Sequence, residues 1–123
     1  GAMRPLVDDN LEQIGRLCRL YGVRKLELFG SILRPDFDPE RSDVDLLVEF
    51  EPQVADSFAN FLDLKGALEG VLGRRVDLVE LRAIRNRRLR HNIEQSKSVV
   101  YERPLAPGVH VLGRTVEQAS DHL

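Results

Sequence analysis

The sequence predicts one small α/β domain in which strands alternate with amphipathic helices. Two short segments, 24–29 and 43–50, alternate apolar and polar residues with the period of two that is typical of strands. Two longer segments, 11–21 and 57–71, repeat apolar residues every three or four positions, which indicates helices that cover a sheet. With 123 residues, the chain is long enough to bury one core unaided.

The first half of the chain places one helix before two strands. Residues 8–10 are N-cap candidates for this helix, and Gly22 ends it. Its apolar positions are Leu11, Ile14, Leu17, Cys18 and Tyr21. The strand over 24–29 then enters a Gly-Ser turn, and a loop with prolines leads to the strand over 43–50. Pro52 breaks the strand pattern that precedes it.

The second helix and the third strand follow this loop. Ser57 is the expected N-cap of a helix that extends to about residue 71, and Gly73 closes it. The expected core positions of the helix are Phe58, Phe61, Leu62, Leu64, Leu68 and Leu72. Segment 75–81 then reads as a third strand, which carries Asp77 between apolar neighbours.

The last predicted elements are a helix and a short strand. The helix is expected around 87–96, where it presents Leu89 and Ile93 to the core. The three residues 99–101 are apolar or aromatic, and they indicate a short strand or an extended end.

The ends of the chain and its composition bound the domain. Residues 1–3 are interpreted as an expression-tag remnant, 4–103 as the domain, and 104–123 as a C-terminal extension. The extension is rich in Pro, Gly and small polar residues; a partner-binding segment, a mobile end and vector-derived sequence remain open as interpretations. The net charge of −2 gives no global sign of nucleic-acid binding. Cys18 lies among leucines, and we expect a buried, unreactive thiol.

The sequence also carries a prediction about location. No apolar segment approaches the length of a membrane span, and no signal-peptide pattern is present. We therefore expect a soluble, cytoplasmic protein.

Two aspartates two residues apart form the most informative pattern in the chain. Asp43 and Asp45 point to the same face of their strand, and Val44, Leu46 and Val48 point to the other. Two adjacent carboxylates repel each other unless a cation lies between them, and Mg²⁺ prefers such oxygens. The preceding turn suits phosphate, because Gly30 allows close approach, Ser31 offers a hydroxyl and an amide, and Arg34 offers a planar fork.

The order of these motifs resembles a known family. A Gly-Ser pair, an arginine three residues later and the run SDVDLLVEF are similar to the nucleotidyltransferase superfamily of the DNA polymerase β type. More narrowly, they resemble its minimal nucleotidyltransferases (MNT), single small domains often paired with HEPN-domain toxins. The resemblance covers roughly residues 10–102, and the loop after Ser31 is one residue longer than is typical. It implies an α/β (α+β) fold with a small mixed β-sheet flanked by helices, the polymerase β-like palm.

The resemblance implies a site built on three carboxylates. Asp43, Asp45 and Asp77 match the family's metal-binding and catalytic positions, and they are expected to hold two Mg²⁺ ions. Asp77 is expected to complete the second metal site and to accept the proton of the attacking hydroxyl.

The resemblance also implies a substrate and a partner. Gly30 and Ser31 are expected to hold the β and γ phosphates of ATP, with Arg34 as counter-charge. The implied reaction transfers AMP from ATP to a hydroxyl, expected on a tyrosine, of a cognate HEPN ribonuclease toxin. The chain is then the antitoxin that neutralises this toxin in a heteromeric complex.

Each interpretation has a simpler alternative. The aspartate pair could be an exposed strand end, the Gly-Ser pair an ordinary tight turn, and Asp77 a solvated residue on a polar strand face. Arg34 could pair with Asp36 or Asp38. For the whole protein, the alternatives are a binding module that neutralises its partner by occlusion, and a transferase acting on a small molecule or an RNA end.

One segment has an unusual charge. Between residues 82 and 90 the chain carries Arg82, Arg85, Arg87, Arg88 and Arg90. A solvated helix start, a docking surface for an acidic or nucleotide-bearing partner, and an RNA contact all fit this pattern. The isoelectric point of about 5.9 and the absence of interleaved aromatic residues argue against direct nucleic-acid binding.

Overall fold

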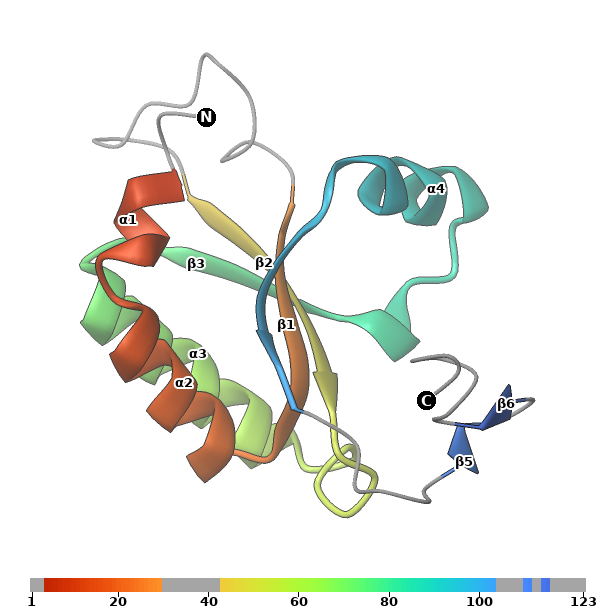
Figure 1. The fold of residues 1–123 in the computed structure, drawn as a ribbon, viewed down its shortest axis with the longest axis horizontal. Helices are drawn as coiled ribbons and strands as arrows, with labels where there is room; N and C mark the ends of the chain where they lie inside the picture. Colours follow the sequence, from red (N-terminus) through yellow and green to blue (C-terminus); the bar gives the residue numbers. More distant parts are fainter. Residues whose placement is uncertain (1–3, 30–42, 104–109, 112–113, 116–123) are drawn as a thin grey trace.

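A four-stranded mixed sheet forms the centre of the computed structural model, which describes residues 4–29, 43–103, 110–111 and 114–115 (Figure 1). The strands are β1 (Val23–Phe29), β2 (Val44–Phe50), β3 (Val76–Glu80) and β4 (Ser98–Glu102). They lie in the order β3-β2-β1-β4. β1 is antiparallel to β2 and β4, whereas β2 and β3 are parallel. The predicted mixed sheet is therefore confirmed.

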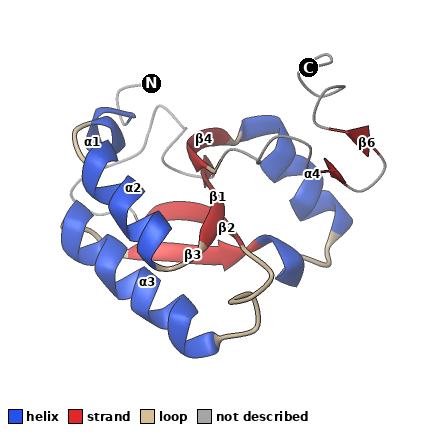
Figure 2. Cartoon of the chain, turned by 60° about the horizontal axis from the view of Figure 1, so that its bottom comes forward, coloured by secondary structure: helices blue, strands red, loops and turns tan. Residues whose placement is uncertain are grey.

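Helices cover both faces of this sheet. The helical elements are α1 (Arg4–Asp8), α2 (Leu11–Leu20), α3 (Phe58–Leu72), the 3-10 turn η2 (Leu81–Ala83) and α4 (Arg87–Ser96). Figures 1 and 2 show α1, α2 and α3 together on one side of the sheet and α4 on the other. The main core lies under the first group, where fully buried side chains include Ile14, Leu26, Leu28, Leu46, Leu64 and Leu68.

The start of α2 differs from the prediction. Asn10 occupies the N-cap position, as expected, but its side chain makes no capping hydrogen bond to α2. Its amide nitrogen instead donates to the carbonyl oxygen of Leu6 at 2.9 Å, because the chain before it already forms the short helix α1. Leu11, predicted to be apolar core, is 39% exposed.

The ends of α3 follow the prediction. The Ser57 hydroxyl accepts a hydrogen bond from the backbone N–H of Asn60 at 3.1 Å, which makes it a capping side chain. Gly73 adopts the left-handed conformation with φ of +65° and donates its N–H to the carbonyl of Glu69 at 2.8 Å. Both ends of the helix are therefore set by local residues, which is why sequence alone located them.

The predicted core stripe of α3 was partly wrong. Leu64, Leu68 and Leu72 are buried, but Phe58 is 70% exposed and Leu62 is 46% exposed. α3 carries apolar residues around much of its circumference, and the sheet and α2 cover only one side of it. Phe58 stacks on Phe61 instead, with ring centroids 6.2 Å apart.

A smaller core lies on the opposite face, under α4. The residues buried there together are Leu47 of β2, Ile93 of α4, and Ile84, which precedes α4. Leu89, the other predicted core residue of α4, is 48% exposed, so that prediction was wrong. Ile93 is the residue of α4 that packs in this smaller core, and the partly buried Phe29, Val79 and Leu81 pack against it.

An ion pair fixes the C-terminal end of α4 to the sheet. Glu27 of β1 is 4% exposed, and its carboxylate lies 3.5 Å from Nζ of Lys97 and 3.9 Å from Nζ of Lys25. Lys97 follows directly after α4 and also contacts Glu94 at 2.8 Å. A buried carboxylate needs such partners, since losing them would leave an uncompensated charge.

Cys18 is buried in α2, and no disulfide partner exists because it is the single cysteine of the chain. Burial raises the pKa of its thiol to about 12, against an opposing effect of the Arg19 charge. The thiolate, which is the reactive form, is therefore scarce at neutral pH. The predicted unreactive thiol agrees with this environment.

The described part of the chain beyond residue 103 consists of two strands. β5 (His110–Val111) and β6 (Arg114–Thr115) pair antiparallel to each other. Residues 1–3, interpreted as a tag remnant, lie outside the described residues, and the boundary at 103/104 stays a prediction. Across the described ranges, no helix is both long and apolar enough to span a bilayer.

Two glycines with positive φ offer a matched test of this fold. An alanine at Gly73 would meet the strain of a left-handed backbone alone, since no atom lies within 4 Å of the added Cβ. At Gly22, with φ of +70°, the added Cβ would also come within 2.7 Å of Cγ2 of Val54. We expect Gly73→Ala to lower the free energy of unfolding by about 1–2 kcal/mol, and Gly22→Ala to lower it further. Urea denaturation of both variants measures the difference. Equal losses would show that the Val54 side chain moves aside at no cost in free energy.

Candidate active site

The beginnings of β2 and β3 bring the three predicted carboxylates to one edge of the sheet. Asp45 and Asp77 are register partners on these parallel strands, and Asp43 immediately precedes β2. Neighbouring strands lie about 4.8 Å apart, so the two facing carboxylates are close. Val44 donates its N–H to the carbonyl of Arg75 at 2.9 Å, which aligns the starts of both strands.

The strand alternation predicted from sequence explains why these carboxylates face the same way. Val44 and Leu46 are buried in the main core under α2 and α3, so Asp45 points to the opposite face. On β3, Val76 and Leu78 face the main core in the same way, and Asp77 points away from it. Asp45 and Asp77 therefore share one face of the sheet.

Burial and the neighbouring carboxylates both raise the pKa of Asp77. The Asp77 side chain reaches the surface, yet partial burial of its carboxylate raises its pKa above the ordinary value. The negative charges of Asp45 and Asp43 raise the pKa further, and the positive charge of Lys65 opposes them. A carboxylate with this environment gains from any cation that lies between it and its neighbours.

This donor set fits Mg²⁺ in its chemistry. Carboxylate oxygens on adjacent strands are the ligands that this hard cation prefers, and mutual repulsion is what a bound cation would relieve. Within the described ranges, no three acidic, histidine or cysteine side chains already converge into a metal-binding group. The assignment of Mg²⁺ to Asp43, Asp45 and Asp77 therefore stays a prediction.

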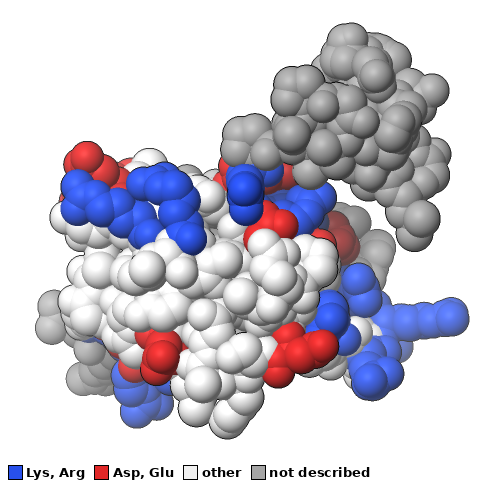
Figure 3. Space-filling view, turned by 90° about the horizontal axis from the view of Figure 1, so that it is seen from below, with Lys and Arg blue, Asp and Glu red and all other residues white. Residues whose placement is uncertain are grey.

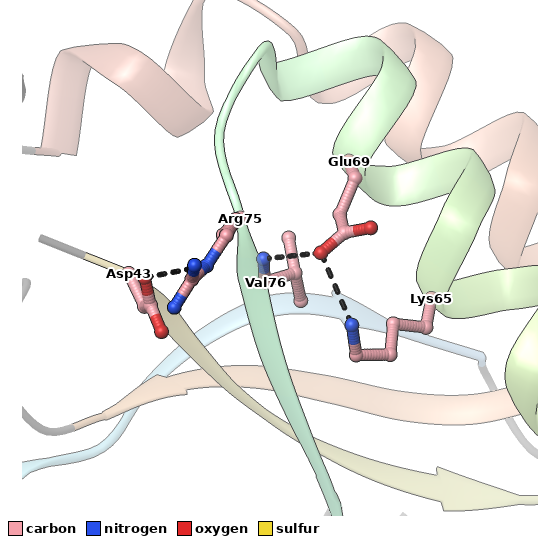
Figure 4. Close-up of polar contacts among 5 residues, drawn as sticks. All are labelled: Asp43, Lys65, Glu69, Arg75 and Val76. Carbon is pink, nitrogen blue, oxygen red and sulfur yellow. Dashed lines mark hydrogen bonds and ion pairs between the residues drawn. The ribbon is translucent and has the colours of Figure 1, made fainter. Parts of the chain in front are cut away.

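An arginine that the sequence analysis overlooked stands beside Asp43. Nε of Arg75 lies 3.5 Å from Oδ1 of Asp43, across the gap between the starts of β3 and β2 (Figure 4). The Arg75 side chain is 83% exposed, so this pair contributes little to stability. Its effect is local: it places a positive charge at the carboxylate edge.

A second overlooked contact fixes the start of β3. Glu69 of α3 accepts hydrogen bonds from the backbone N–H of Val76 at 2.9 Å and from Nζ of Lys65 at 3.1 Å (Figure 4). The bond from Val76, followed by that from Lys65, lowers the pKa of Glu69. The Lys65–Glu69 spacing of four is visible in sequence, but the contact with Val76 is tertiary. It ties α3 to the residue that precedes Asp77.

The predicted nucleotide-binding residues lie outside the described residues. Gly30, Ser31 and Arg34 follow β1, which ends at Phe29, and Phe29 is the register partner of Asp45. Their assignment to phosphate binding stays a prediction.

A hollow of about 430 Å³ lies at the other end of β3. Its lining includes Phe58, Phe61, Glu80 and Arg82. On β3 its lining runs from Leu78 to Glu80, and Leu78 follows Asp77 directly but faces the main core on the opposite side of the sheet. Nη2 of Arg82 contacts Oδ1 of Asp56 at 2.7 Å, and its Nε lies 3.4 Å from Glu80. This hollow is separate from the carboxylates, and Arg82 is engaged there.

A mixed sheet that gathers carboxylates where two parallel strands begin, next to a strand that leads into a Gly-Ser pair, defines a protein of the nucleotidyltransferase class. The chain belongs to the nucleotidyltransferase domain family, whose sequence model matches residues 12–100. The predicted family is therefore confirmed, and with it the class of enzyme.

Sequence relatives point to one branch of this family. A protein of Methanocaldococcus jannaschii, provisionally named a protein adenylyltransferase, is 39% identical over 75 residues, which are 61% of this chain and 74% of the relative. The protein adenylyltransferase MntA of Thermococcus cleftensis is 48% identical over 59 residues, which are 48% of this chain and 57% of the relative.

Solved structures agree with this branch. A structure provisionally described as a minimal nucleotidyltransferase superimposes with a TM-score of 0.63 at 36% identity, covering 80% of this chain and 91% of the other. The MNT antitoxin complexed with a tri-AMPylated HEPN toxin of Shewanella oneidensis gives a TM-score of 0.56 at 24% identity, covering 79% and 73%. The second likeness shows the fold alone.

Proposed function

We propose that this chain is an Mg²⁺-dependent protein adenylyltransferase that acts as the antitoxin of a HEPN ribonuclease toxin. It transfers AMP from ATP to a hydroxyl of the toxin, which we propose to be that of a tyrosine, and this modification neutralises the toxin. The observation that carries the proposal is the register pairing of Asp45 with Asp77 beside Asp43, in a chain of the nucleotidyltransferase family. Names of relatives support a protein as the acceptor.

The proposed reaction is an in-line displacement at the α-phosphorus of ATP. The acceptor hydroxyl oxygen forms the new P–O bond, and the bond from the α-phosphorus to the bridging oxygen breaks. Pyrophosphate leaves with the electrons of that bond. The hydroxyl proton passes to the carboxylate of Asp77, which lies opposite Asp45 at the start of β3.

The remaining residues bind and orient the substrates. Asp43 and Asp45 would hold Mg²⁺ with Asp77, and the bound metal supplies charge neutralisation for the phosphates and activation of the hydroxyl. Gly30, Ser31 and Arg34 are proposed to hold the phosphate chain. Glu69 keeps the start of β3 in place, so that Asp77 stays opposite Asp45.

Mass spectrometry of the partner tests this function. The chain is co-expressed with the protein encoded beside it, the candidate HEPN-domain partner, and the partner's mass and modified residue are determined. We expect one or more added AMP groups on a hydroxyl side chain. Co-expression of the Asp43→Asn/Asp45→Asn variant is the control, and it should leave the partner unmodified.

The same experiment separates catalysis from occlusion. A partner that is neutralised in a stable complex yet carries no AMP would contradict the proposed transfer and support neutralisation by binding. An unmodified, unbound partner together with a modified RNA or small molecule would point to a different acceptor.

A further inference from the structure

Four exposed arginines lie at the beginning of α4. This α4 arginine cluster consists of Arg85, Arg87, Arg88 and Arg90. All four side chains are exposed. No carboxylate of the described residues pairs with Arg85, Arg87 or Arg88, whereas Arg82 is held by Asp56 and Glu80. Figure 3 shows basic side chains projecting at the right of the molecule, the side on which Figure 1 shows α4.

The placement of this cluster is unfavourable for the isolated domain. A helix N-terminus carries a partial positive charge, so acidic residues stabilise it and basic residues do not. The first turn of α4 contains no acidic residue, and Arg87 and Arg88 are its first two residues. Asn86 caps the helix with its side chain, accepting from the N–H of Leu89 at 3.0 Å, so the arginines are not needed as capping residues. Their charge at this end of the helix is therefore not explained by the helix dipole or by capping.

The α4 arginine cluster lies on the face of the sheet to which Asp45 and Asp77 point. Leu47 follows Asp45 by two residues and faces the same side of the sheet, at a distance of about 7 Å along the strand. Leu47 packs against Ile84 and Ile93, which flank the cluster in the chain. A protein that covers this face while presenting a hydroxyl to Asp45 and Asp77 can therefore also contact α4.

We propose that the α4 arginine cluster is the docking surface for an acidic surface of the protein acceptor. The identity of the acceptor rests on the proposed function. The surface itself rests on the exposure of the four arginines, on their position, and on Arg85, Arg87 and Arg88 having no carboxylate partner among the described residues; Nη1 of Arg90 donates to the carbonyl of Ile84 at 3.5 Å. No Phe, Tyr or Trp is interleaved with them on which bases could stack, and the net charge of the chain is −2. Both features argue against RNA as the partner and favour a protein.

Association kinetics test the docking surface. The full chain and its Arg87→Glu/Arg88→Glu variant are compared, at low and high salt, for binding to the immobilised candidate partner, the protein encoded beside this chain. We expect the reversal to slow association about tenfold or more at low salt, with a smaller effect on dissociation. The difference should shrink at high salt, because exposed charges are screened. Arg87→Lys/Arg88→Lys should keep most of the rate, since steering depends on charge.

A matched reversal on the other side of the sheet serves as the control. Arg16 and Arg19 are exposed on α2, and Arg16→Glu/Arg19→Glu changes the net charge equally. This variant should associate at close to the wild-type rate, and both reversals should retain the fold and Mg·ATP affinity. An association rate that both reversals change equally, or that neither changes, would overturn the proposal. So would an absence of binding by the wild-type chain.

Two further outcomes separate the docking surface from the proposed function. Charge-dependent binding to a partner that receives no AMP would keep the surface and remove the transfer. AMP transfer with charge-independent association would keep the transfer and remove the surface. Loss of binding to a single-stranded RNA oligonucleotide, with unchanged association to the protein, would reassign the cluster to RNA and contradict the proposal.

Discussion

Replacing Asp43 and Asp45 together by asparagine is expected to abolish the Mg²⁺-dependent binding of ATP. Substituting a residue that hydrogen-bonds to a metal ligand lowers metal affinity about 10–100-fold. Removing the ligands themselves should lower it by more. Calorimetry with and without Mg²⁺ measures the effect. Equal heats with and without the metal in the wild-type chain would contradict the metal assignment of both residues.

Glu49 offers the matched control for this variant. It lies on the same strand, further from the strand start, and its register partner is Lys25 of β1. Glu49→Gln removes a carboxylate from β2 without touching the predicted cluster, so it should bind Mg·ATP normally. The double variant should also unfold at a higher temperature than the metal-free wild-type chain, because repulsion among the carboxylates is relieved.

The carboxylate site was predictable because it depends on local periodicity. The period of two in a strand is enough to place Asp45 on the face opposite Val44 and Leu46, and the family motif adds Asp77. The ends of α3 were predictable for the same reason, since Ser57 caps its own helix. These features require no knowledge of what packs against them.

The missed features depend on neighbours that are distant in sequence. Phe58 and Leu89 fit helical periods, but their exposure depends on how much of each helix the sheet covers. Arg75 and Glu69 show no motif of their own. Their contacts with Asp43 and Val76 exist because β3 is parallel to β2 and lies beside α3. Sequence periodicity carries no information about such pairings.

Replacing Asp77 by asparagine is expected to separate chemistry from binding. If Asp77 accepts the proton of the acceptor hydroxyl, Asp77→Asn should lower the rate of AMP transfer by roughly 10²–10⁴-fold, the usual span for a general base. ATP affinity should change much less, because Asp43 and Asp45 remain. Single-turnover transfer to the HEPN-domain protein, with ATP binding measured separately, distinguishes the two effects. Wild-type transfer by this variant would leave Asp77 with a structural role.

The same substitution should raise the stability of the metal-free protein by an amount that depends on pH. The pKa of Asp77 is raised in the folded protein, so the cost of its charge to folding grows as the pH rises above the ordinary pKa and is complete once the pH exceeds the raised value. Asp77→Asn removes this cost, and the variant should be more stable than the wild-type chain at about pH 7 without metal. The gain should shrink toward about pH 4, where the ordinary pKa of aspartate lies and the wild-type carboxyl becomes protonated in both states.

Urea denaturation in the presence of a chelator measures this gain at several pH values. Asp63→Asn, an exposed position on α3, is the control, and its stability relative to the wild-type chain should not follow the same pH course. If Asp77→Asn brings no gain at neutral pH, the three carboxylates do not repel one another as their register indicates. Adding Mg²⁺ should reverse the order of stabilities, because a bound cation turns the cost of the Asp77 charge into an attraction that asparagine cannot supply. A gain that persists unchanged with Mg²⁺ would place the cation elsewhere, and Asp77 would then act as a base without being a ligand.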